Sequence, residues 1–401
     1  MVDTNHYASF VISIYTMEIK KLADWFTKFK EPSLSGRYIN LNHLKSLLNQ
    51  NLKFGSIEIT GFSENNLPIH IIKMGAGPKK MLFWSQMHGN ESTTTKAIFD
   101  LIRFLENSSD PVVSQILDRA TLYIIPMLSP DGALAYTRLN YNAVDLNRDA
   151  QDLTQKESTI LRQVINDVKP DLAFNLHGQR TIYSAGNTDK SAVVSFLSPA
   201  GDADRTVTNS RKKAMQVIVA MNTLLQNVLP DQIGRYNDGF NINCIGDTLS
   251  SEKIPVILFE AGHYPGDYNR EETRRYIFYS LVKAIHYTAT QQIDGKNHED
   301  YFSIPENDTC FYDILIRNVK VNSQIVDIGI QYEEQLYENR IKFIPKVAAI
   351  ENLEKKYGHF EIIGNQRPIR HENDAVDIVE GITLSKFFLN NELFSIEMSN
   401  N

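Results

Sequence analysis

Short apolar runs alternate with longer amphipathic stretches between about Glu58 and Thr290. Apolar runs of this kind are typical of strands in a buried sheet, and the amphipathic stretches are typical of helices that cover it. The predicted strands are Ile69–Lys73, Met81–Met87, Thr121–Met127, Leu172–Leu176, Val193–Phe196 and Val256–Glu260. The predicted helices lie near Thr93–Glu106, Gln155–Val168, Arg205–Asn227 and Arg270–Thr288. This pattern predicts one α/β unit of catalytic size.

From roughly His298 onward the chain changes to short β-rich runs separated by polar turns. These runs are Phe311–Val321, Gln324–Ile330, Ile341–Val347 and His359–Ile363. The segment from Ala375 to Leu384 is interpreted as two further strands around Glu380-Gly381. We therefore predict a catalytic domain over residues 17–297 and a smaller β-rich domain over residues 298–401, in which no catalytic constellation is evident.

The start of the chain holds a second candidate initiator, Met17, which opens a better helix than the residues before it. We expect residues 1–16 to be an extension before the natural start. The segment Tyr7 to Tyr15 is short and lacks the basic region and the cleavage site of a signal peptide. Because no window approaches the roughly 18 consecutive apolar residues of a membrane span, we predict a cytoplasmic protein without membrane contact.

The composition of the 401 residues, 42% hydrophobic and 22% charged, is that of a globular protein. The net charge is −7 and no run of Lys or Arg exceeds three residues, which argues against a nucleic-acid partner. Cys244 and Cys310 lie far apart and form no zinc-binding spacing, so neither a disulfide framework nor a cysteine-rich metal module is expected. The composition predicts nothing about oligomeric state.

The strand predicted at Met81–Met87 ends in His88-Gly-Asn-Glu91, and a helix follows. In α/β proteins, active sites lie beyond the carboxyl ends of strands. An imidazole and a carboxylate three residues apart can converge there on one zinc ion. This pair also arises by chance, and the alternative is a satisfied His88 with Glu91 at the start of a helix.

Two other predicted strands end in chemically useful residues. One ends in His177-Gly178, so His177 is a candidate third metal ligand, with a core or loop histidine as the alternative. The other ends in Glu260, which follows a run of apolar residues. Desolvating a carboxylate there is costly unless the group is used, and a glutamate beside a metal-bound water can act as general base. The alternative for Glu260 is a helix-capping carboxylate.

A loop between the first and second histidines contains Asn147 and Arg148, with Arg138 upstream. An arginine has a planar fork that suits carboxylate recognition, and asparagine adds a neutral donor, so this loop is a candidate site for an anionic end of a substrate. Asp145 and Asp149 flank the arginine, which leaves a surface ion-pair loop as the alternative.

Taken together, these elements resemble the zinc metallocarboxypeptidases of the M14 family. The resemblance spans about residues 58–290 and rests on residues in the family's order: His88, Glu91, Asn147, Arg148, His177 and Glu260. It implies a mixed sheet of about eight strands sandwiched by helices. It also implies one zinc ion per chain on the two histidines and Glu91, with Glu260 as general base and Asn147 and Arg148 on the substrate's terminal carboxylate.

The resemblance implies further roles. Arg138 corresponds to the arginine that stabilises the oxyanion, although it lies closer to Asn147 in sequence than in the digestive members. Tyr236 is the counterpart of the family's mobile substrate-binding tyrosine. The residue that selects the substrate side chain falls within Ile242–Asp247, where no motif anchors the alignment.

The sequence leaves the scissile bond open. The His-Gly-Asn-Glu motif is similar to that of bacterial intracellular M14 members and of related deacylases of the succinylglutamate desuccinylase and aspartoacylase type. A carboxypeptidase acting on peptides is our first prediction, and a deacylase of N-acyl amino acids or an amidase of cell-wall peptides is the alternative. A non-catalytic binding protein is a third reading. No Gly-x-Ser-x-Gly elbow supports serine hydrolysis.

Overall fold

The computed structural model describes residues 18–398 and divides into two compact units. The first unit extends to Gln179 and resumes from Ala192 to Asn307, and the second comprises residues 180–191 and the chain from Asp308 onward. The predicted extension over residues 1–16 lies outside the described residues. The predicted domain boundaries, 17–297 and 298–401, assigned residues 180–191 to the catalytic domain and remain a proposal.

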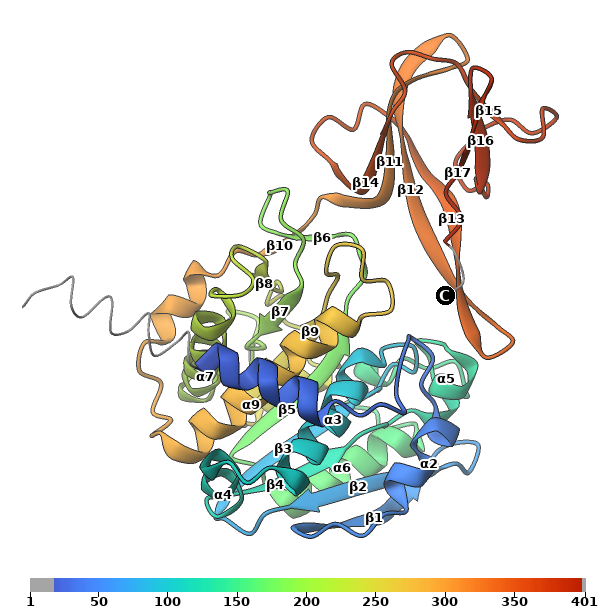
Figure 1. The fold of residues 1–401 in the computed structure, drawn as a ribbon. Helices are drawn as coiled ribbons and strands as arrows, with labels where there is room; N and C mark the ends of the chain where they lie inside the picture. Colours follow the sequence, from blue (N-terminus) through green and yellow to red (C-terminus); the bar gives the residue numbers. More distant parts are fainter. Residues whose placement is uncertain (1–17, 399–401) are drawn as a thin grey trace, which may run out of the picture. The chain divides into compact units, whose positions relative to one another are not determined.

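The first unit is built on a mixed eight-stranded sheet with the order β1-β2-β4-β3-β5-β9-β7-β8 (Figure 1). Strands β3, β4, β5 and β9 are mutually parallel, whereas β7 runs antiparallel to β9. The strands are β1 (Gly55–Phe62), β2 (Pro68–Met74), β3 (Lys79–Ser85), β4 (Ala120–Ile125), β5 (Leu172–Gly178), β7 (Val194–Leu197), β8 (Ile233–Arg235) and β9 (Val256–Ala261). The predicted α/β fold is confirmed.

Helices cover both faces of this sheet. Successive residues of a strand point to opposite faces, so Phe83 packs with the helices on one side and Leu82 with those on the other. The buried cluster around Phe83 includes α3 (Thr93–Asn107), α4 (Pro111–Leu117), α7 (Asn209–Leu225) and α9 (Glu271–Thr290). The cluster around Leu82 includes α6 (Lys156–Val168) and α8 (Ile245–Ser251). Residues 18–29 are also helical, as are α2 (Leu41–Leu48), α5 (Pro130–Ala135), η1 (Leu146–Arg148) and η2 (His298–Ser303).

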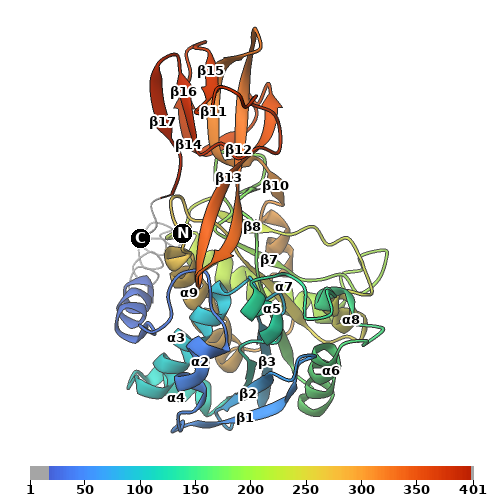
Figure 2. The same ribbon diagram turned by 90° about the vertical axis from the view of Figure 1, so that its right-hand side faces the viewer.

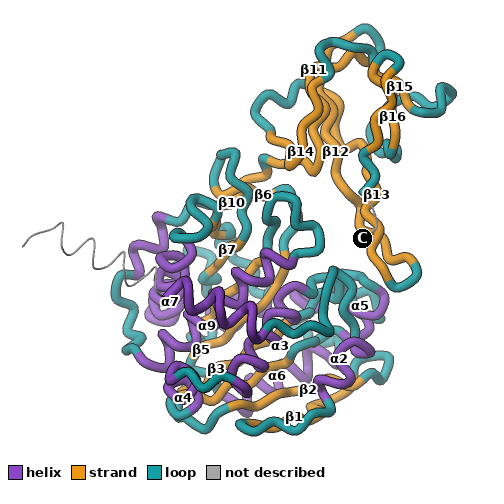
Figure 3. Tube along the Cα trace, viewed as in Figure 1, coloured by secondary structure: helices purple, strands orange, loops and turns teal. Residues whose placement is uncertain are grey.

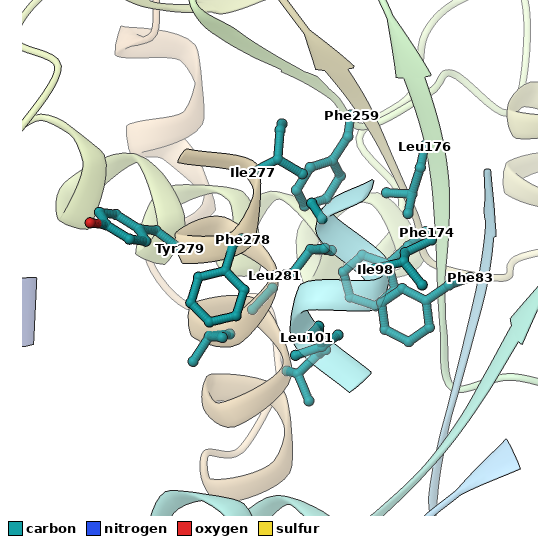
Figure 4. Close-up of a cluster of buried hydrophobic side chains, with 14 of the residues drawn as sticks. Phe83, Ile98, Leu101, Phe174, Leu176, Phe259, Ile277, Phe278, Tyr279 and Leu281 are labelled. Atoms are coloured by element: carbon teal, nitrogen blue, oxygen red, sulfur yellow. The ribbon is translucent and has the colours of Figure 1, made fainter. Parts of the chain in front are cut away.

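The core between β3, β5, β9 and the helices is aromatic (Figure 4). Phe83 stacks on Phe174 with ring centroids 4.3 Å apart, and Phe174 lies 6.0 Å from Phe259. Aromatic side chains bury large areas and hold preferred relative orientations. These three side chains therefore fix the relative positions of the three strands whose ends carry the predicted metal ligands and base.

Among its described residues, the second unit consists of strands and turns without helices (Figure 3). A four-stranded sheet has the order β13-β12-β11-β14, and a three-stranded sheet has the order β15-β16-β17. The long hairpin of β12 and β13 is visible in Figure 2. The strands are β6 (Tyr183–Ala185), β10 (Asn307–Thr309), β11 (Phe311–Val321), β12 (Gln324–Tyr337), β13 (Arg340–Glu351), β14 (Tyr357–Ile363), β15 (Ile369–His371), β16 (Lys386–Leu389) and β17 (Glu392–Ser395). The predicted β-rich character is confirmed.

The interpretation of Ala375 to Leu384 as two strands is wrong. The segment contains a turn at Gly381, with φ +88°, and only one isolated bridge, between Thr383 and Lys346. Buried Ile378 and Leu384 anchor the segment to the core of the second unit. The apolar pattern that suggested strands therefore reflects anchoring of an irregular segment.

Within residues 18–398, no helix is both long enough and apolar enough to cross a membrane.

Candidate active site

Three neighbouring strands place their candidate residues at one edge of the sheet. His88 follows β3, and His177 is the penultimate residue of β5. Glu260 lies opposite His177 in β9. Because β3, β5 and β9 run parallel, their carboxyl ends meet at the same edge. The sheet topology therefore brings together residues that are far apart in sequence.

The side chains of His88, Glu91 and His177 form a group that could hold a metal ion, with one donor atom from each within 4.8 Å of the others. Glu91 Oε1 lies 2.8 Å from His88 Nδ1, and Glu91 Oε2 lies 2.9 Å from His177 Nδ1. The backbone N–H of Gly178 also donates to Glu91 Oε2, at 3.0 Å. Two imidazoles and one carboxylate are the donor set of several catalytic zinc sites, so these residues fit the ion that the resemblance implies.

Asp145 orients the first of these ligands. Its Oδ1 lies 3.0 Å from His88 Nε2, which leaves Nδ1 of the same ring facing Glu91. Histidines that bind metals usually donate their second ring nitrogen to a carboxylate or carbonyl in this way. From the sequence, Asp145 was expected to be only an ion-pair partner in a surface loop. No spacing rule could have found its role, because the contact with His88 joins segments 57 residues apart.

The carboxyl of Glu91 is held in its ionised form. Burial alone would raise its pKa, but the His88 charge and hydrogen bonds from both histidines lower the pKa well below its ordinary value. For His177, burial lowers the pKa and outweighs the neighbouring Glu91 carboxylate. An ionised carboxylate and a neutral imidazole are the protonation states that bind metal ions.

Glu260 has a different environment. It lies between His177 of β5 and Ser195 of β7, and its Oε2 is buried without a hydrogen-bond partner in the described part of the chain. Burial, reinforced by the nearby Glu91 charge, raises the pKa of Glu260 well above its ordinary value. A carboxyl with a raised pKa in a candidate site can exchange protons near neutral pH.

Arg138 lies beside the candidate ligands. Its guanidinium is 3.0 Å from Asp145 Oδ2 and 3.4 Å from Glu91 Oε1, and the side chain is 46% exposed. A cation that contacts the metal-binding group and remains partly exposed can also reach a bound substrate. Its role in stabilising an oxyanion stays a prediction.

Asn147 and Arg148 lie in η1, immediately after Asp145. The Asp145 carboxylate accepts from the backbone N–H of Asn147 at 2.9 Å, so one side chain supports both His88 and this loop. Asn147 Oδ1 accepts from the backbone N–H of Ile245 at 3.3 Å, which joins the loop to the start of α8. Arg148 is exposed to solvent. Its charge is therefore accessible to a ligand.

The remaining candidates are less closely tied to the metal-binding group. Tyr236 follows β8, which is separated from β9 by β7, and its backbone N–H donates to the carbonyl of Phe196 at 3.0 Å. Its role as the mobile tyrosine stays a prediction. The unanchored stretch Ile242–Asp247 contains the start of α8, where burial raises the pKa of Asp247 to about 6.

Comparison with known proteins supports the same family. The family model described as zinc carboxypeptidase matches residues 41–181. Carboxypeptidase M of Mus musculus is 25% identical over 177 residues, which are 38% of this chain and 37% of that protein. The chain thus aligns with little more than a third of the length of this relative.

Solved structures show the same fold. A metallo-carboxypeptidase from Burkholderia cenocepacia is 19% identical, with a TM-score of 0.51 over 66% of this chain and 70% of that one. Thrombin-activatable fibrinolysis inhibitor is 12% identical, with a TM-score of 0.51 over 68% of this chain and 81% of that one. Over residues 41–181 the chain is therefore similar to the M14 family of zinc carboxypeptidases, and its fold is shared with metallocarboxypeptidases of known structure.

Proposed function

We propose that this protein is a zinc-dependent peptidase that removes the C-terminal residue of a peptide. The observation that carries this proposal is the pairing of a buried His-Glu-His group with Glu260, which lies directly opposite His177 on the adjacent strand. The match of residues 41–181 to the zinc carboxypeptidase family model supports the same proposal.

His88, Glu91 and His177 would hold one zinc ion, with Asp145 fixing the ring of His88. When bound, zinc supplies a Lewis acid and lowers the pKa of water towards ~7. The lowered pKa values of Glu91 and His177 suit this role, because a metal ligand must present a lone pair.

Glu260 would act as general base and then as general acid. Its carboxylate would take a proton from the attacking water and deliver that proton to the leaving amine. The raised pKa suits both steps, because a carboxyl with a raised pKa is a stronger base and holds the proton that it later delivers to the amine. Its unpartnered Oε2 has no competing hydrogen bond among the described residues.

Arg138, Asn147 and Arg148 would bind the substrate. Arg138 contacts Glu91 and is partly exposed, so it would stabilise the negative charge that develops on the scissile carbonyl oxygen. The exposed Arg148 and the neighbouring Asn147 would hold the terminal carboxylate. This arrangement predicts that a free carboxylate next to the scissile bond is required.

A substrate panel tests the proposal. The zinc-loaded protein is assayed on matched peptides with free or amidated C-termini, on N-acyl amino acids and on cell-wall peptides, with the Glu260→Gln variant as control. Turnover of the free peptides that is lost on amidation supports a carboxypeptidase. Activity confined to N-acyl amino acids or cell-wall peptides would replace it with a deacylase or amidase. Stoichiometric zinc without turnover of any substrate would indicate a binding protein.

A further inference from the structure

Arg270 is a buried arginine close to the proposed site that has no role in the function described above. Its side chain is only 2% exposed. It occupies the N-cap position of α9, where its backbone adopts the left-handed conformation with φ 58°. This conformation is unfavourable for a residue with a side chain, and burial of a guanidinium is costly. The strained backbone and the buried guanidinium are therefore expected to be offset by favourable contacts.

Two hydrogen bonds of the Arg270 side chain join it to the segments that carry His177 and Glu260. Its Nη1 donates to the carbonyl of Ala261, and its Nη2 donates to the carbonyl of Gln179, each at 3.0 Å. Ala261 directly follows Glu260, and Gln179 lies two residues after His177. One planar side chain therefore connects the ends of β5 and β9.

These contacts lie at the end of the paired region of β5 and β9. The last register pair of β5 and β9 is Gly178 with Ala261, and one more backbone bond runs from the N–H of Gln179 to the carbonyl of Ala261. Among the described residues, no backbone hydrogen bond joins the two segments beyond this one. The guanidinium thus extends the pairing of the strands past its last backbone bond.

The N-terminus of α9 does not require the Arg270 side chain. The carboxylate of Asp267 accepts from the first backbone N–H groups of the helix, those of Glu271, Glu272 and Thr273. Capping of the helix and bridging of the strands are therefore carried by different side chains. A loss of the Arg270 guanidinium would remove the bridge while the cap remains.

We propose that Arg270 is a positioning residue that holds His177 and Glu260 at the relative distance required for catalysis. This inference rests on the proposed function. Arginine suits the task because its rigid fork donates two hydrogen bonds in fixed directions, which the flexible lysine side chain does not reproduce. Displacement of catalytic groups by even about 1 Å lowers rates by about a hundredfold.

The test compares Arg270→Met and Arg270→Lys with the control Arg211→Met. Arg211 is also fully buried and donates to backbone carbonyls, at Ser198 and Arg205, but it lies in α7. Each variant is loaded with Co²⁺, whose visible absorption spectrum reports the geometry of the ligands, and kcat and KM are measured on the best substrate of the panel. The spectrum is read whether or not the protein is active.

We expect Arg270→Met to bind stoichiometric Co²⁺ with an altered spectrum and a kcat reduced about 10- to 100-fold at unchanged KM. Arg270→Lys should recover part of kcat, and Arg211→Met should be less stable while keeping the spectrum and kcat of the parent. A folded Arg270→Met with the parent's spectrum and kcat overturns the inference. If neither Arg270 variant folds while Arg211→Met does, Arg270 serves folding and the inference also fails. A parent protein that turns over no substrate defeats the proposed function instead, while the Co²⁺ spectra still test the role of Arg270.

Discussion

Two groups of buried charged side chains in the first unit differ in how their polar atoms are satisfied. The first is an ionic cluster of Asp100, Arg274, Lys96 and Glu271, and the second is the proposed site. Arg274 donates to both oxygens of Asp100 at 2.5 and 2.6 Å and to the carbonyl of Leu34 at 2.6 Å. Lys96 donates to Glu271 at 2.5 Å. Each charge in this cluster has a partner of opposite sign.

The proposed site keeps some of its polar atoms without partners. His177 Nε2 and Glu260 Oε2 are buried and lack hydrogen bonds among the described residues. Buried polar atoms are normally satisfied, and those that are not are often reserved for function. Burial of charged groups by itself therefore does not indicate catalysis. We therefore expect substitutions in the ionic cluster to affect stability and substitutions in the site to affect metal binding and turnover.

The largest effect is expected from loss of a metal ligand. His177→Ala removes one of the donor atoms of the His-Glu-His group and should abolish both stoichiometric zinc binding and turnover. Zinc content after dialysis and kcat are measured together. His286→Ala, in a histidine that contacts Gln115 on another part of the unit, should keep both. Full zinc content in His177→Ala would contradict the ligand set.

Glu260→Gln should separate chemistry from metal binding. It keeps the size of the side chain but removes the general base, so kcat should fall about 10²- to 10⁴-fold while zinc content stays at one per chain. Because the carboxyl is buried with a raised pKa, the amide should not lower the melting temperature. Undiminished kcat would refute the role of Glu260. A large loss of stability would show that Glu260, like the residues of the ionic cluster, contributes mainly to folding.

Arg274→Met should do the opposite. It leaves the carboxylate of Asp100 buried and uncompensated, so the free energy of unfolding should fall by about 3–5 kcal/mol. Zinc affinity and the kcat of the folded fraction should stay at their parent values. Arg275→Met, which alters the partly exposed neighbour that pairs with Glu272, serves as control and should change stability much less. Urea denaturation with zinc titration measures both quantities, and a loss of zinc affinity would mean that the two groups are coupled.

Asp145→Asn should weaken metal binding without abolishing it. The substitution removes the negative charge that faces His88 Nε2, and loss of such an outer contact typically reduces metal affinity about 10- to 100-fold. Competition with a fluorescent zinc chelator measures this change. Asp189→Asn, at an exposed position of the second unit, is the control. An unchanged affinity would show that Asp145 does not support the ligand.

The smallest effect concerns acid stability of the ionic cluster. Burial raises the pKa of Glu271. The charge of Lys96 and the hydrogen bonds from Lys30 and Lys96 outweigh burial and lower this pKa to about 2. A carboxyl whose pKa is depressed on folding stabilises the protein above its ordinary pKa of 4.5, and this stabilisation is lost as the pH falls from 4.5 towards 2. Glu271→Gln should therefore reduce the difference in urea midpoint between pH 6 and pH 3, whereas Glu272→Gln should not. An equal reduction in both variants would contradict the assignment.

The sequence by itself determined the elements around the proposed site. The strands that end near His88, His177 and Glu260 were predicted within a few residues, because a strand buried on both faces is a continuous apolar run that stands out locally. The mixed α/β fold followed from the alternation of such runs with amphipathic stretches, and the order of the polar strand ends carried the resemblance to the family. These are properties of contiguous segments.

Only the tertiary structure decided the rest. The contact of Asp145 with His88, the bridge from Arg270 to two strand ends and the assignment of residues 180–191 to the second unit depend on pairing between distant segments. Short elements such as β8 and α8 were missed because so few residues carry too weak a periodic signal. The segment from Ala375 to Leu384 was wrongly predicted to form strands because its apolar pattern is strong although its backbone is irregular. Its apolar residues mark burial, and burial in an irregular segment leaves the same local pattern as a strand.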